Sequence, residues 1–182
     1  MGKKYFLKLK KNYFFSDKPA FSMIEIITIL LVVSIGMTGL MSLIVQNIQS
    51  QSINKKTLIA YQLAQEGVEL IRQVRDSNWR SRVGIDSWKT NLAAGEYYMD
   101  YTNNLPVPAE GVSSGKLSQD ADGMYYSNPG GSLTENDFAR IITIDYPDSL
   151  TGKMKLNSTV YWADGGKKSF YTIEAELYDW RQ

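Results

Sequence analysis

The chain has 182 residues, of which 43% are hydrophobic and 21% charged, and its formal net charge is +1. A chain of this size and composition is expected to fold as one compact domain with an appendage, and its near-neutral charge argues against binding to nucleic acid. The sequence has no histidine and no cysteine, which excludes Ser-His-Asp and Cys-His nucleophiles, Cys/His zinc sites and disulfide bonds.

A basic head precedes a long apolar segment. Residues 1–20 carry a net charge of +5, which leaves −4 on residues 21–182. No charged residue occurs between Glu25 and Lys55, and the stretch 26–45 would span about 30 Å as a helix, the thickness of a bilayer's hydrocarbon core. Because the lysines come first, the positive-inside rule predicts a single-pass segment with its N-terminus in the cytoplasm and the rest of the chain outside.

Glu25 lies at the cytoplasmic edge of this segment. A carboxylate there is unfavourable if it enters the hydrocarbon, by about 2.5 to 3.5 kcal/mol at mid-membrane, so it is a candidate functional residue. The alternative is a side chain that reaches out to the lipid headgroups. Residues 42–52 contain no A-x-A cleavage site of a secretory signal, so the apolar segment is expected to stay attached.

The residues around Glu25 form a specific motif, Lys-Pro-Ala-Phe-Ser-Met-Ile-Glu at positions 18–25, followed by the uncharged stretch. It resembles the class III leader and mature N-terminus of type IV prepilins and pseudopilins, where a prepilin peptidase cleaves before the Phe and methylates the new amine. The resemblance implies cleavage between Ala20 and Phe21, methylation of Phe21, and a subunit-assembly role for Glu25. Ala20 stands where the family usually has Gly.

The resemblance also implies partners: the prepilin peptidase, other pilins or pseudopilins, an inner-membrane assembly platform, and membrane lipid before assembly. In a stack of subunits, Glu25 of one chain would neutralise the amine of Phe21 on another. Four small residues allow close approach of helices, or alternatively loosen the helix locally: Ser34, Gly36, Gly39 and Ser42. No cofactor, metal ligand or catalytic residue is expected.

A helical period continues past the apolar segment, over residues 54–80, which we call the stem. Its apolar stripe comprises Ala60, Leu63, Ala64, Gly67, Leu70, Ile71 and Val74, and Glu66 and Glu69 are expected on the solvent side. The stripe is too irregular for a coiled coil, so a sheet of the same chain is the predicted partner. The stem sequence is similar to that of PilV-like minor pilins.

Residues 91–137 are rich in glycine, proline and short polar side chains, which predicts a variable loop region. Within it, the alternation over residues 97–102 predicts one strand. Asp120 and Asp122 precede Gly123 and resemble the start of a calcium loop, but the ligand pattern of an EF-hand is missing, and a plain Asp-Gly turn is favoured.

Three strands are predicted in the region 138–180, at residues 140–146, 155–162 and 170–178, with a tight reversal at 164–167. The predicted fold class is therefore α+β: one long N-terminal helix, with a transmembrane half and an amphipathic half, packed on a C-terminal antiparallel sheet. This order is similar to that of pilins.

The expected organisation is a cleaved leader (residues 1–20), a membrane or filament-core helix (21–53) and a pilin-like domain (54–182). The expected function is that of a structural minor pilin-like subunit in the cytoplasmic membrane and then in a type IV pilus, and not that of an enzyme. Two alternatives stay open: a pseudopilin of a type II secretion or DNA-uptake system, and a single-pass anchored protein that binds a ligand outside the membrane.

Overall fold

The structure is a computed structural model that describes residues 21–81, 87–131, 133–134, 137–147, 152–164 and 166–179. The expected leader, with Ala20, lies outside these residues. The chain divides into two compact units, Met1–Asn47 and Ile48–Gln182. The elements are the helix α1 (Met23–Ser81), the 3₁₀ helices η1 (Ser87–Lys89) and η2 (Val112–Gly115), and the strands β1 (Gly95–Tyr98), β2 (Val107–Pro108), β3 (Lys116–Gln119), β4 (Tyr125–Ser127), β5 (Phe138–Asp145), β6 (Lys153–Asp164) and β7 (Lys167–Tyr178).

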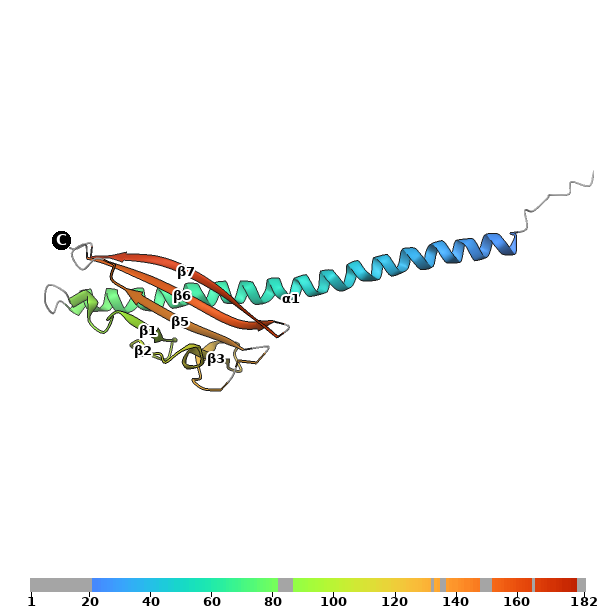
Figure 1. The fold of residues 1–182 in the computed structure, drawn as a ribbon. Helices are drawn as coiled ribbons and strands as arrows, with labels where there is room; N and C mark the ends of the chain where they lie inside the picture. Colours follow the sequence, from blue (N-terminus) through green and yellow to red (C-terminus); the bar gives the residue numbers. More distant parts are fainter. Residues whose placement is uncertain are drawn as a thin grey trace, which may run out of the picture. The chain divides into compact units, whose positions relative to one another are not determined.

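The fold is α+β, as predicted, with the stem of α1 packed on an antiparallel sheet (Figure 1). α1 is one helix of 59 residues. It contains no proline, which would break the hydrogen-bond ladder. Its first turn holds the acidic Glu25 and its last turn the basic Arg80, and both charges suit the helix dipole.

The buried residues of α1 all lie in the stem and confirm the predicted stripe: Ala60, Leu63, Ala64, Gly67, Val68, Leu70, Ile71, Val74, Arg75 and Trp79. The prediction that Glu69 faces solvent is confirmed: Glu69 is exposed and forms an ion pair with Arg72 one turn later. The same prediction is wrong for Glu66, which is half-buried because its carboxylate pairs with Arg140 of the sheet.

Strand β5 is the centre of the sheet. It pairs with β6 along its whole length, and its other edge is shared by β3, at residues 138–139, and β1, at residues 142–144. β7 continues the sheet beyond β6, β2 beyond β1, and β4 beyond β3. The three strands predicted near the C-terminus correspond to β5, β6 and β7, and the reversal between the last two is present as an antiparallel hairpin. β7 and β4 therefore form opposite edges of the sheet.

The loop region differs from the prediction. The strand predicted over 97–102 ends at Tyr98, because the Asp100 carboxylate accepts the backbone N–H of Thr102 (2.8 Å) and Asn103 (3.1 Å) and so folds the chain into a turn. The rest of the region contains η2 and the short strands β2, β3 and β4. Strands of two to four residues leave too few positions for an alternating pattern to be visible.

Two clusters of buried side chains hold the stem on the sheet. The smaller joins Ala60, Leu63 and Ala64 to Leu117, Phe138, Val160 and Trp162. The larger joins the stem from Val68 to Trp79 with Trp88, Leu92, Met99, Ile142, Ile144, Met154, Leu156 and Leu177. Both clusters use the inner faces of the strands, so the sheet covers the stripe that would otherwise face water.

A buried arginine links the stem to the sheet near the point where the two clusters meet. Arg140 extends from β5, is 1% exposed, and donates one guanidinium N–H to the Leu63 carbonyl oxygen (2.8 Å). The same nitrogen lies 3.1 Å from a Glu66 carboxylate oxygen, and the second terminal nitrogen donates to the Met99 carbonyl oxygen. Burial lowers the pKa of Arg140, and the Glu66 charge opposes that effect. One side chain thus joins α1, β5 and the segment after β1.

Gly67 provides the space for this arginine. A Cβ atom at position 67 would lie 2.4 Å from the Ser158 Oγ atom and 2.9 Å from the Arg140 Cδ atom. Both distances are far below van der Waals contact, so this close approach of the stem to the sheet requires a residue without a side chain.

We predict that a fragment starting at Asn54 folds alone, because the stem and the sheet bury each other's apolar faces without the preceding segment. It should be soluble and monomeric by light scattering and mixed α/β by circular dichroism. An aggregated or unfolded fragment would show that the stem needs residues 21–53 to pack on its sheet.

We also predict that Gly67→Ala lowers the free energy of unfolding by about 1 to 3 kcal/mol, because the added methyl group overpacks the contact with Ser158. Ser158→Ala removes the nearest atom, so the double variant should recover part of the loss in urea unfolding. Gln73→Ala, on the exposed side of the same helix, is the control and should change stability little. Strictly additive effects of the two changes would contradict the proposed contact.

Candidate assembly site on the apolar segment of α1

The predicted assembly residues Phe21 and Glu25 lie at the start of α1. Ser22 precedes the helix, and its carbonyl oxygen accepts the backbone N–H of Glu25 (3.0 Å) and Ile26 (3.2 Å). Phe21 is 71% exposed, and Glu25 is exposed in the first turn. A free amine on Phe21 and the Glu25 carboxylate would therefore both be accessible to other molecules.

The sequence also suggests a local role for Glu25 that the assembly hypothesis left out. Ser22 and Glu25 stand three residues apart, as in the capping box Ser-x-x-Glu, and the position of Ser22 is that of an N-cap residue. A carboxylate in the first turn also interacts favourably with the helix dipole, by about 0.3 to 1 kcal/mol. Any test of Glu25 in assembly must therefore separate pairing between chains from helix capping within the chain.

The helix after Glu25 carries an uncovered apolar surface. Its most apolar 18-residue window has a mean hydropathy of 2.3 and no residue buried within the chain, so α1 is a candidate membrane span by length and composition. The large apolar side chains of this segment are all at least 45% exposed. Such a surface is stable only in lipid or against other chains.

Polar groups inside the apolar segment are bonded to the helix itself. The hydroxyl groups of Ser34 and Thr38 donate to the carbonyl oxygens of Leu30 (2.7 Å) and Ile35 (2.8 Å), and Thr28 donates to Ile24. No hydroxyl of these three residues is left without a partner, as an apolar medium requires. Gly36 and Gly39 have no atom within 4 Å of an added Cβ, so packing within the chain does not explain them.

The favoured Asp-Gly turn agrees with the contacts of Asp120. One carboxylate oxygen accepts the backbone N–H of Asp122 (3.0 Å) and Met124 (2.8 Å), which is the bonding of an Asx turn. The other oxygen accepts the Tyr101 hydroxyl group (3.2 Å). Among the described residues, no group of three or more Asp or Glu side chains could hold a metal ion.

Two other polar groups in the unit Ile48–Gln182 stabilise its loops. Burial opposes the charge of Asp100, but hydrogen bonds from Thr102 and Ser127 outweigh this effect and lower its pKa. Burial raises the pKa of Tyr146 to about 12, and the Tyr146 hydroxyl group donates to the Leu92 carbonyl oxygen (2.6 Å). Each of these groups is fully engaged with its own chain, which favours a structural role.

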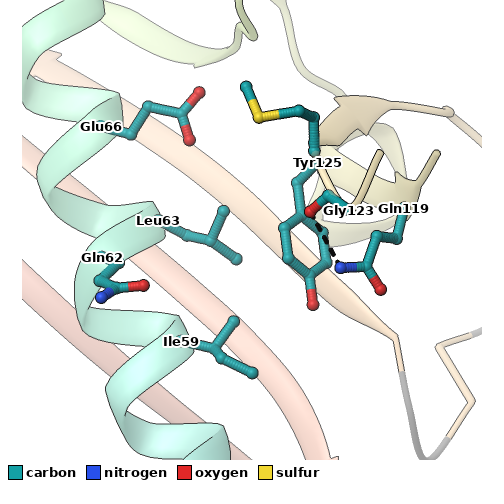
Figure 2. A pocket seen from close by; sticks show the side chains of 8 residues that line it. Ile59, Gln62, Leu63, Glu66, Gln119, Gly123 and Tyr125 are labelled. Atoms are coloured by element: carbon teal, nitrogen blue, oxygen red, sulfur yellow. Dashed lines mark hydrogen bonds between the residues drawn. The ribbon is translucent and has the colours of Figure 1, made fainter. Parts of the chain in front are cut away.

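A pocket lies between the stem and the turn that joins β3 to β4. Its volume is about 350 Å³, and Figure 2 shows the stem residues on one side and Gln119, Gly123 and Tyr125 on the other. The Gln119 side chain donates to the Gly123 carbonyl oxygen (2.9 Å) and holds the turn in shape. The lining residues are Ile59, Gln62, Leu63, Glu66, Gln119, Gly123, Met124 and Tyr125. Nothing in the sequence pattern predicted this pocket.

Comparisons of the chain with protein-family models, with curated proteins and with solved structures gave no match. The function is therefore argued from the residues and contacts of this chain.

Proposed function

We propose that this chain is a structural, minor pilin-like subunit of a type IV pilus. It is inserted in the cytoplasmic membrane as a prepilin, cleaved and methylated by a prepilin peptidase at Phe21, and assembled through the apolar segment of α1. The unit Ile48–Gln182, which contains the sheet, is then displayed on the filament surface. The chain performs no chemistry of its own in this proposal.

One observation carries the proposal: the two halves of α1 differ in what covers their apolar side chains. The stem of α1 is covered by its own sheet, whereas the large apolar side chains before residue 50 are uncovered. A simple anchor would also have an uncovered apolar helix. A simple anchor gains only helix capping, however, from a carboxylate at position 25, and it has no use for the leader-like motif around that residue.

Transfer of the apolar segment from lipid into a filament requires specific interactions between chains. Lipid tails are as apolar as leucine, so moving the segment from lipid into a filament core gains little from the hydrophobic effect. Close packing and polar pairing must then drive the transfer. Gly36 and Gly39 would let neighbouring helices approach, and Glu25 would neutralise the amine of Phe21 on a neighbouring chain in an apolar environment.

Processing is the first test of this proposal. Intact-mass analysis of the protein from native membranes should show loss of residues 1–20 and an added methyl group on Phe21. An uncut chain would favour the anchored binding protein, and a cut after residue 45 would favour a secretory signal.

Assembly is the second test, through Glu25. We expect Glu25→Ala to be inserted and cleaved but depleted from sheared filaments, because an unpaired amine in an apolar core destabilises the assembly by about 3 to 5 kcal/mol. Glu25→Gln keeps a hydrogen-bonding side chain and should show a milder defect. The readout is the ratio of filament to membrane protein on immunoblots.

Ser22→Ala is the matched control for Glu25→Ala. It removes the hydroxyl group at the N-cap position but keeps the carboxylate, so it should assemble nearly as well as the unchanged protein. If Ser22→Ala is as defective as Glu25→Ala, the carboxylate acts by capping the helix. If Glu25→Ala enters filaments normally at matched membrane levels, the pairing mechanism is wrong.

A further inference from the structure

The hairpin of β6 and β7 runs along the stem, and its reversal lies beside the first residues of the stem (Figure 1). The Lys56 side chain donates to the carbonyl oxygen of Ala163, one residue before the end of β6 (3.2 Å). At the other end of the hairpin, Leu177 belongs to the same buried cluster as Trp79 of the stem. The reversal therefore points toward the N-terminal end of the stem, which is the end that follows the apolar segment in the chain.

Lysines gather at this end of the hairpin. Lys167 and Lys168 are exposed at the start of β7, and Lys55 is exposed on the stem next to Lys56. The reversal contains one acidic residue, Asp164, so these five residues carry a net charge of +3. In the proposed orientation they lie outside the cytoplasm, where lysines close to a span are scarce. Four lysines at this position favour contact with an anionic partner.

Chain length brings the lysines close to a membrane surface. Lys55 follows the apolar stretch 26–45 by ten residues, which is about 15 Å of helix. The headgroup layer takes up about 5 to 8 Å of that distance, so an upright helix holds Lys55 within about 10 Å of the headgroups. Charges interact over about 8 to 10 Å at physiological salt, and the flexible lysine side chains shorten the gap. The hairpin end, which contacts Lys56, lies at the same level.

An exposed aromatic side chain follows the two lysines of β7. Phe170 is 68% exposed, and its ring lies 6.2 Å from that of Tyr161. Phe170 and Lys168 share the face of β7 that is turned away from the stem, because alternate residues of a strand share a face and Tyr171 contacts Tyr61 of the stem. Spanning helices are tilted by about 20° on average, and a tilt toward β7 lowers this face to the headgroups, where aromatic side chains are stable.

The opposite edge of the sheet is unsuited to such a contact. The turn that joins β3 to β4 carries Asp120 and the exposed Asp122, and the pocket places this turn beside Ile59 of the stem. Anionic headgroups repel carboxylates and attract lysines. The charges therefore favour a tilt of the sheet toward β7 and away from β4.

We propose that the end of the β6–β7 hairpin contacts an anionic phospholipid surface before assembly. Lys55, Lys167 and Lys168 bind the headgroup phosphates, and the Phe170 ring lies among the headgroups. The inference deepens the proposed function, on whose membrane-inserted prepilin it rests, by naming the lipid class that the chain contacts outside its span. Each lysine strengthens such a contact about fivefold, so the contact is weak and forms because the span already holds the chain at the membrane.

Quenching by lipid in the full chain tests this contact. The natural chain has no cysteine, so Thr172→Cys, an exposed site two residues after Phe170 on the same face of β7, can carry a bimane dye and leaves the contact residues unchanged. The labelled chain is placed in nanodiscs that contain a lipid with a nitroxide on its headgroup. We expect quenching to be about twofold stronger with phosphatidylglycerol than in phosphatidylcholine alone, and high salt should remove the difference.

Matched variants test the charges and the ring separately. Lys167→Glu with Lys168→Glu should lower quenching to the phosphatidylcholine level, whereas Lys167→Arg with Lys168→Arg should preserve it. Phe170→Ala should reduce quenching, and Tyr178→Ala, an exposed aromatic side chain on the same face at the far end of β7, should leave it unchanged. A dye on Thr90→Cys, an exposed site beside Asn78 at the far end of the stem, should be quenched several-fold less in either lipid.

The outcomes separate this inference from the proposed function. Equal quenching with and without phosphatidylglycerol, or equal quenching of the glutamate and arginine variants, would overturn the lipid contact. The pilin-like function would still stand if that chain is cleaved and enters filaments. Charge-dependent quenching of a chain that is never cleaved in cells would support the lipid contact and count against the pilin-like function.

Discussion

The position of the stem on the sheet depends on one buried cation. Arg140 reaches from β5 to a helix carbonyl, a helix carboxylate and the carbonyl of Met99, so three separate segments share one side chain. Burying a guanidinium is unfavourable by several kcal/mol unless its hydrogen bonds are made. Sliding the stem along the sheet would break these bonds together. The apolar clusters on either side supply most of the stabilisation, and the arginine defines a single register.

That register also positions the walls of the pocket between the stem and the β3–β4 turn. The Ile59 and Leu63 side chains that line the pocket lie within two helical turns of the Glu66 residue that pairs with Arg140. The carbonyl of Met99 binds the same guanidinium, and the next residue, Asp100, organises the turn after β1 and also accepts the backbone N–H of Ser127 from β4. A change at the arginine would therefore displace both walls of the pocket, although Arg140 is not among its lining residues.

Periodicity made the stem, β5, β6 and β7 predictable from the sequence. Each is long enough for a repeat of about 3.6 or 2 residues to stand out, and the stripe from Ala60 to Val74 is buried as expected. The burial of Arg140 could also have been predicted, because alternate residues of a strand share a face, which places Arg140 with Ile142 and Ile144 on one face of β5. The pocket was not predictable, since it joins the stem to a turn some 60 residues later whose approach depends on tertiary packing. The assembly roles of Phe21 and Glu25 stay predictions.

The order of the elements has a consequence for biogenesis. In the proposed N-terminus-inside orientation, the stem would leave the membrane before the strands that cover it, β5 to β7, because Arg140 follows its acceptor Leu63 by 77 residues. The apolar stripe would then stay uncovered until β5 to β7 have also crossed the membrane. A chain that stops before β7 would leave part of that stripe exposed to proteases and chaperones.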